Sequence, residues 1–239
     1  MSKLRVDIWS DIACPWCYIG KRRLEGALAQ FDHRDDVEIV WRAFELDPSA
    51  PRVRPAEQSY ADRLAGKYGT GRAQAQVMLD RMVGTAAADG LEFRFDHIKP
   101  GNTFDAHRLL HLAGELGMQD ALKERLLRAY MTEGRAIGEP TVLAELAIEA
   151  GLPADQVREL LAGDRFAVEV RADEAEAREL RISGVPFFVI DGRLGVSGAQ
   201  PAEVLRGALA QGWTDAHAAA NSADAQFAEG AACGPDGCA

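Results

Sequence analysis

The chain has 239 residues, of which 47% are hydrophobic and 27% charged, a composition typical of a globular protein with a sizeable core. Its formal net charge of −10 comes without a cluster of lysines and arginines, which argues against nucleic acid and anionic membranes as partners. No apolar run approaches membrane-spanning length and no signal peptide is recognisable, so we expect a cytoplasmic protein. In a reducing compartment, four cysteines favour catalysis, redox sensing or metal binding over structural disulfides.

The first part of the chain has the pattern of a βαβ unit. Residues 4–9 alternate and are rich in strand formers, residues 15–31 carry apolar side chains near helical spacing, and residues 37–43 resemble a second strand. Cys14 and Cys17 lie where the first strand passes into the helix. Open α/β proteins place their chemistry at this edge of the sheet.

The stretch Cys14-Pro15-Trp16-Cys17 predicts a redox-active dithiol. Cys14 would adjoin unpaired N–H groups and the positive end of the helix dipole, which favour the attacking thiolate. Cys17, one turn later, can close a disulfide ring with Cys14 and so resolve a mixed disulfide with the substrate. Pro15 suits the first helical turn. Trp16 is expected to offer substrate an apolar contact. Half of a zinc site, or two core cysteines, is the alternative.

A proline-punctuated loop at residues 47–55 is followed by a long helical region. Glycines between apolar-periodic segments mark most of the helix ends. The predicted helices cover residues 56–68, 71–88, 102–116, 119–132, 140–150, 154–162 and 164–181.

The pattern returns to strands near the end. Residues 185–190 form an apolar strand, Asp191-Gly192 a hairpin turn, residues 193–196 a returning strand and residues 200–210 a closing helix. Few large apolar residues follow, so we expect a flexible tail. The predicted divisions are an α/β domain at 1–46 and 183–212, an inserted helical domain at 47–182 and a tail at 213–239.

Three motifs in this order resemble the DsbA family of thioredoxin-fold oxidoreductases, and more narrowly its FrnE-like cytoplasmic branch. The motifs are residues 11–20, 185–190 and 195–201. The resemblance implies a thioredoxin-like fold with a large inserted all-helical domain. It also implies a protein disulfide oxidoreductase or isomerase with Cys14 as its nucleophile.

The resemblance further implies a cis peptide bond before Pro186, with this proline facing the cysteine pair. The Val185 backbone would then be available to pair with an extended substrate, beside the contacts of Pro15 and Trp16. An ordinary trans proline at the start of an edge strand is the alternative.

A second cysteine pair, Cys233 and Cys238, resembles one found in some FrnE-type members. Roughly 20 flexible residues would span about 25 Å, at ~5–6 Å × √n. We therefore expect the tail to reach Cys14 and Cys17 as an auxiliary redox pair. An inert tail is the alternative.

Other titratable residues allow two interpretations each. Asp11 could tune the pKa of Cys14 or be a solvated loop carboxylate, and Asp7 could accept the proton of Cys17 or point outward. His107 and His111 have a spacing that can hold zinc, but no glutamate of a zinc protease accompanies them, so no metal is assigned.

The sequence thus predicts thiol–disulfide exchange with disulfide or dithiol proteins or with small thiols, without a bound cofactor. Glutathione or thioredoxin would be the electron partner, and the sequence does not indicate the oligomeric state. One alternative is a glutathione transferase or isomerase of small molecules from the same superfamily, where serine commonly replaces the first cysteine. The other is a zinc protein using all four sulfurs.

Overall fold

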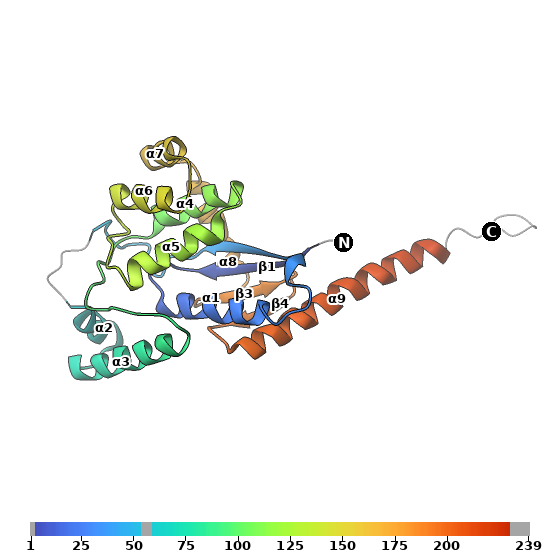
Figure 1. Ribbon diagram of the computed structural model, residues 1–239, viewed down its shortest axis with the longest axis horizontal. Helices are drawn as coiled ribbons and strands as arrows, with labels where there is room; N and C mark the ends of the chain where they lie inside the picture. Colours follow the sequence, from blue (N-terminus) through green and yellow to red (C-terminus); the bar gives the residue numbers. More distant parts are fainter. Residues whose placement is uncertain (1–2, 54–58, 230–239) are drawn as a thin grey trace, which may run out of the picture.

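A four-stranded sheet lies at the centre of the computed structural model, which describes residues 3–53 and 59–229, with residues 219–229 described by their backbone only (Figure 1). In spatial order the strands are β2 (Val37–Ala43), β1 (Leu4–Ser10), β3 (Phe187–Ile190) and β4 (Leu194–Ser197). β1 runs parallel to β2, whereas β3 runs antiparallel to β1 and β4. The predicted βαβ unit and the later pair of strands therefore form one sheet, as expected for the α/β fold.

Different helices cover the two faces of this sheet. α1 (Pro15–Leu28) and α9 (Ala202–Glu229) pack on one face, and α8 (Ala167–Glu179) packs on the other. The side chains of β1 alternate between the faces, so Ile8 joins the core under α1 and α9 while Trp9 packs toward α8. This alternation decides which residues of β1 can approach the cysteines of α1.

The helical segment between β2 and β3 holds the largest hydrophobic core. Tyr18 and Ile19 of α1 belong to the same core, so the start of α1 is packed against the inserted helices. Each helix of the segment, α8 included, falls inside a range predicted from the sequence, which confirms an all-helical insertion. Its other helices are α2 (Tyr60–Tyr68), α3 (Arg72–Ala88), α4 (Phe104–Glu115), α5 (Gln119–Met131), α6 (Pro140–Glu149) and α7 (Ala154–Ala162).

The last helix is longer than predicted. A flexible tail was expected from residue 213, but α9 continues to Glu229 and projects beyond the rest of the molecule (Figure 1). Alanine is frequent in this stretch and is the best helix former, so a helix needs no large apolar residues here. Trp213 also anchors the helix, because its ring stacks 4.0 Å from those of His33 and His217.

Cys233 and Cys238 lie outside the described residues. Over the part of the chain that the structure describes, no helix is long and apolar enough to cross a membrane.

Candidate active site

The dithiol lies where β1 leads into α1, as predicted. Cys14 is the N-cap residue of α1, Pro15 follows at the first helical position, and no side chain caps the helix. Both cysteines are free thiols; Cys14 is 5% exposed and Cys17 is fully buried. Access to the pair is therefore through Cys14, while Cys17 is enclosed by the fold.

A hydrogen bond couples the titration of the two thiols. The hydrogen bond with Cys17, followed by burial, raises the pKa of Cys14 well above its usual range. Burial alone would also raise the pKa of Cys17, but the hydrogen bond from Cys14, the charge of Lys123 and the hydroxyl of Ser10 lower it. The dithiol thus loses its first proton at a lower pH than an isolated thiol and its second proton at a higher pH.

The attacking thiolate on Cys14 stays a prediction, and the hydrogen bond between the two sulfurs bears on it. The helix N-terminus does favour a negative charge at this place. The hydrogen bond between the sulfurs raises the pKa of Cys14 and lowers that of Cys17, so a proton can pass between them. Transfer of the proton along this hydrogen bond converts Cys14 into the thiolate at the accessible position.

A cis proline faces the cysteine pair, as the resemblance implies. The Val185–Pro186 peptide bond is cis, and the Cys14 Sγ donates a 3.5 Å hydrogen bond to the Val185 carbonyl oxygen. Trp16 is 42% exposed and Pro15 half-buried. These residues form a surface around the Cys14 sulfur where a substrate chain can be received.

Gly20 is a site residue that the sequence reading missed. A Cβ atom at this position would lie 2.8 Å from Cγ of Pro186, which real Cβ contacts essentially never allow. Gly20 faces the core of the protein from α1. Its lack of a side chain lets the proline ring approach the helix that carries the dithiol.

We expect Gly20→Ala to destabilise the fold by about 1–3 kcal/mol, because a methyl group is forced into a filled space. Gly26→Ala is the matched control, since its Cβ would meet that of Ala202 at 3.6 Å, an ordinary contact in the same helix. This control should stabilise the fold by about 0.5–1 kcal/mol through helix propensity. Urea denaturation of both variants measures the difference, and equal effects would contradict the packing argument.

Asp11 is buried behind the dithiol loop, so its interpretation as a solvated carboxylate is wrong. Its carboxylate accepts hydrogen bonds from the N–H groups of Leu46 (2.8 Å) and Ala13 (3.3 Å) and lies 3.4 Å from Nε2 of His107. Burial would raise the pKa of Asp11, but the contact with His107 and the Leu46 bond lower it. Asp11 therefore ties the loop before Cys14 to α4 and to the segment that follows β2.

Asp7 does not accept a proton from Cys17. It extends toward the α8 face of the sheet, where it pairs with Arg5 (2.9 Å) and Arg42 (2.7 Å). α1 covers the opposite face, so of the two interpretations the one in which Asp7 accepts the proton of Cys17 is wrong. The alternation of β1 places Asp7 on the same side as Trp9.

His107 and His111 are directed to different partners. His107 lies beside Asp11, whereas Nε2 of His111 is 3.0 Å from the carboxylate of Asp173 in α8. In residues 3–53 and 59–229, no cluster of histidine, cysteine and carboxylate side chains has the arrangement of a metal site.

Lys123 of α5 is the second residue that the sequence reading missed. It is completely buried, its Nζ lies 3.4 Å from the carbonyl oxygen of Ser10, and the Trp41 ring is 5.3 Å away. Burial lowers the pKa of Lys123 to about 8, against the charges of Cys17, Asp11 and Cys14. Its position among the buried leucines of α5 was a usable signal, because a lysine at helical spacing within an apolar stripe cannot reach solvent freely.

The fold and the dithiol together define a thioredoxin-fold protein with a cysteine pair at the start of its first helix. The DSBA-like thioredoxin domain model matches residues 5–210, and the chain belongs to this family. A probable DsbA oxidoreductase from Streptomyces coelicolor is 47% identical, with a TM-score of 0.82 over 99% of this chain and 98% of that one. The uncharacterized protein YwbO of Bacillus subtilis (strain 168) is 27% identical over 86% of this chain and 96% of its own length.

More distant structures share the fold. The cytosolic disulfide reductase DsbM from Pseudomonas aeruginosa, solved with GSH, is 18% identical over 87% of this chain and 98% of that chain, with a TM-score of 0.61. A 2-hydroxychromene-2-carboxylate isomerase is 14% identical over 87% and 95%, with a TM-score of 0.60. Because proteins of different activity share this fold, the chemistry must be argued from the site.

Proposed function

We propose that the protein is a thiol–disulfide oxidoreductase that uses Cys14 and Cys17. The observation that carries this proposal is the pair itself: one sulfur borders the surface, the other is enclosed, and a hydrogen bond joins them. A thiolate is the form that attacks disulfides. A serine in place of Cys14, as in the isomerase alternative, would remove this chemistry, and the chain has the cysteine.

The reaction proceeds by two exchanges. The Cys14 thiolate attacks one sulfur of a substrate disulfide, the substrate S–S bond breaks, and the second substrate sulfur leaves as a thiolate. Cys17 then loses its proton and attacks Cys14, which releases the first substrate sulfur. The substrate gains two electrons and the protein is left with a Cys14–Cys17 disulfide; each step is reversible.

A polypeptide substrate would lie beside Pro15 and Trp16 and pair with the backbone at Val185. Trp16 supplies apolar area, and an extended chain can hydrogen-bond to exposed backbone groups next to a strand. Disulfide-containing or dithiol proteins therefore fit this surface, and small thiols can also reach Cys14. Glutathione or thioredoxin would return the pair to its starting state, and a cytoplasmic location agrees with the GSH-bound cytosolic relative in fold.

Cys233 and Cys238 lie outside the described residues, so their exchange with Cys14 and Cys17 stays a prediction; the course of α9 favours exchange with a second molecule. α9 begins beside Gly26 and passes His33 at Trp213, so it runs away from Cys14. Its 28 residues extend about 42 Å at 1.5 Å per residue, whereas the nine residues from 229 to 238 reach at most about 32 Å. With α9 formed, we propose that Cys233 and Cys238 exchange electrons with a second molecule, an auxiliary role that the Cys233→Ser/Cys238→Ser variant tests.

Reduction of insulin disulfides by dithiothreitol is the test of the proposed function. The chain should accelerate this reduction well above the uncatalysed rate, and mass spectrometry of chain equilibrated with glutathione disulfide should find Cys14 bonded to Cys17. Conjugation of glutathione to an electrophile is measured on the same preparation. Conjugation without insulin reduction would favour the transferase or isomerase and overturn the proposal.

A further inference from the structure

A cavity of about 320 Å³ lies in the insertion, between α2, α3 and the segment 91–96. We call it the α2–α3 cavity. Its apolar lining consists of the buried side chains of Leu79, Phe93 and Phe95 and the half-buried ring of Tyr60. Cavities that hold ligands in proteins measure about 300–1,000 Å³, so this one is at the lower end of the range. It has room for one aromatic ring.

A series of ring contacts connects the α2–α3 cavity to the helix of the dithiol. Tyr18, which follows the dithiol directly, stacks on Phe93 with the ring centroids 6.0 Å apart. Phe93 lies edge-on to Phe95 at 5.8 Å, and Phe95 contacts Tyr60 at 4.9 Å. Burial raises the pKa of Tyr60 to about 12, and the charge of Cys14 contributes to this rise. The cavity therefore lies near the dithiol, on the side of the insertion.

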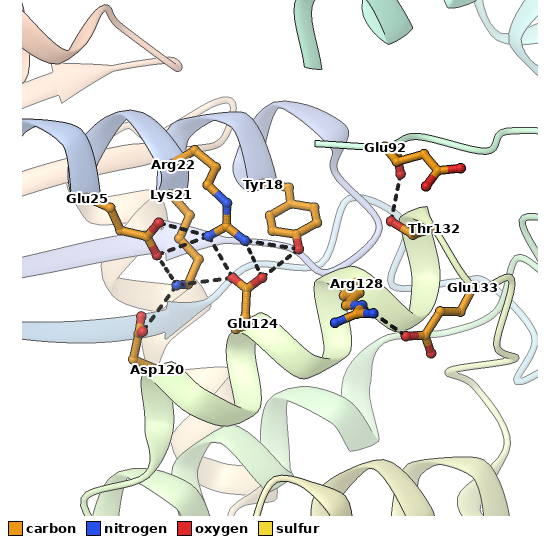
Figure 2. Close-up of polar contacts among 10 residues, drawn as sticks. All are labelled: Tyr18, Lys21, Arg22, Glu25, Glu92, Asp120, Glu124, Arg128, Thr132 and Glu133. Atoms are coloured by element: carbon orange, nitrogen blue, oxygen red, sulfur yellow. Dashed lines mark hydrogen bonds and ion pairs between the residues drawn. The ribbon is translucent and has the colours of Figure 1, made fainter. Parts of the chain in front are cut away.

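The segment 91–96 is fastened to the end of α5. The Thr132 hydroxyl donates a 2.6 Å hydrogen bond to the carbonyl oxygen of Glu92 (Figure 2). The N–H of Arg94 donates to the carbonyl oxygen of Met131 at 2.8 Å. Two aromatic rings of the cavity thus belong to a segment whose backbone is held on both sides of the first ring. A ligand that enters such a preformed cavity has little ordering of the protein to offset.

α5 is in turn fixed to the sheet and to α1. Gln119 accepts a hydrogen bond from the N–H of Trp41 (2.9 Å) and donates one to its carbonyl oxygen (3.0 Å), and Asp120 accepts from the indole nitrogen (3.0 Å). Toward α1, Glu124 accepts a 2.6 Å hydrogen bond from the Tyr18 hydroxyl (Figure 2). The same helix therefore holds both the cavity wall and the helix of the dithiol.

The mouth of the α2–α3 cavity carries more negative than positive charge. Asp80 and Asp96 supply two exposed carboxylates, and Arg72 supplies one exposed guanidinium group. This guanidinium group lies 3.6 Å from the carboxylate of Asp62, and Asp96 lies 3.2 Å from Nε2 of His97. A basic residue of a ligand is therefore favoured at the mouth over an acidic one.

We propose that the α2–α3 cavity is a specificity site that receives an aromatic side chain of the polypeptide substrate while the substrate cysteine is bonded to Cys14. This assignment rests on the proposed function and adds sequence preference to it. An aromatic ring suits the lining, because edge-on and offset ring pairs are stabilised beyond the burial of their area. The ring belongs to a residue a few positions from the substrate cysteine, since each extended residue spans about 3.3–3.6 Å. A lysine or arginine beside it faces the carboxylates of the mouth.

Peptides with one cysteine, joined as a mixed disulfide to 2-nitro-5-thiobenzoate, test the proposal without any variant. The reduced chain attacks the peptide sulfur and releases the coloured thiolate. Phenylalanine is placed in turn at each of the four positions on either side of the cysteine. At the matching position it should raise the second-order rate constant roughly tenfold over alanine, because the ring becomes buried. Equal rates for phenylalanine and alanine at every position would overturn the proposal.

Dithiothreitol supplies the reference for these rates. Each rate is divided by that of the same peptide with dithiothreitol, which removes differences in the reactivity of the peptides themselves. If no peptide reacted with the native chain beyond this reference, the proposed function would fail together with the cavity's role. Reaction of all peptides without a preference would remove only the role of the cavity.

Val83→Trp should abolish the preference for phenylalanine, because Val83 lines the cavity at an exposed position where a larger ring can fill it. Val77→Trp is the matched control, since Val77 is an exposed valine of the same helix outside the lining of the cavity. This control should keep the preference of the native chain. Loss of the preference in both variants, or in neither, would overturn the proposal.

The charge of the mouth is tested with lysine or glutamate beside the phenylalanine. The lysine peptide should react several-fold faster, and Asp80→Asn/Asp96→Asn should reduce this difference. Faster reaction of the glutamate peptide would overturn the proposal. So would conjugation of glutathione to an aromatic electrophile that Val83→Trp abolishes while the peptide rates stay unchanged, because the cavity would then hold a small molecule.

Discussion

Cys14→Ser is expected to lower insulin reduction to the uncatalysed rate, a loss of roughly a thousandfold or more, because a serine hydroxyl is a far weaker nucleophile than a thiolate. Cys17 remains in this variant, but it is fully buried and should not meet a protein disulfide. The variant should fold normally, since serine is smaller and Cys14 lies at the rim. Catalysis retained by Cys14→Ser would show that another group attacks.

Cys17→Ser should trap the mixed disulfide between Cys14 and the substrate, which Cys14→Ser cannot form. Cys14 can still attack, but nothing resolves the product, so a mixed disulfide with the substrate should accumulate and turnover should fall by a similar factor. Mass spectrometry after glutathione disulfide is added should find one glutathione on Cys14. The two variants separate the attack by Cys14 from the resolution by Cys17. A glutathione adduct on Cys14→Ser, and none on Cys17→Ser, would show that Cys17 attacks and Cys14 resolves.

Arg108→Met is expected to cause a large loss of stability, about 3–5 kcal/mol. Arg108 is 3% exposed and donates to the carbonyl oxygens of Leu160 (2.6 Å), Gly163 (2.7 Å) and Arg165 (2.8 Å), and to the carboxylate of Asp105 (2.9 Å). Without the guanidinium group, each of these four acceptors loses a donor. Together they fasten the end of α7 and the following turn to α4.

Urea denaturation measures this loss, and Arg158→Met is its control. Arg158 pairs with Asp155 at the surface, where both side chains are mostly exposed, and such pairs contribute roughly 0–1 kcal/mol. A comparable effect of both substitutions would mean that burial of Arg108 does not matter. Insulin reduction by folded Arg108→Met should be unchanged, because the residue lies in the helical segment away from the sulfurs.

The sequence predicted those parts of the molecule that local patterns determine. Only two residues separate Cys14 from Cys17, and the strand before them and the helix after them could be predicted from side-chain periodicity. The helix ranges of the insertion were correct for the same reason, since apolar spacing and glycine stops are local. The family resemblance added the cis bond before Pro186, which residue types alone do not specify.

The missed features depend on contacts between distant segments. Gly20 matters only because the ring of Pro186 lies against it, and Asp11 is buried only because α4 brings His107 to it. Lys123 lies more than 100 residues from Ser10, whose carbonyl oxygen it contacts, and its surroundings follow from how α5 docks. The length of α9 was missed for a local reason, because helix propensity was given less weight than the lack of apolar residues.

The hydrogen bonds between Gln119 and Trp41 have a consequence for aggregation. β2 is an edge strand, and an unpaired edge is a template for adding a strand from another chain. One side-chain amide occupies both backbone groups of Trp41 that such a strand would use. The middle of this edge is thereby protected against growth of the sheet into an intermolecular fibre.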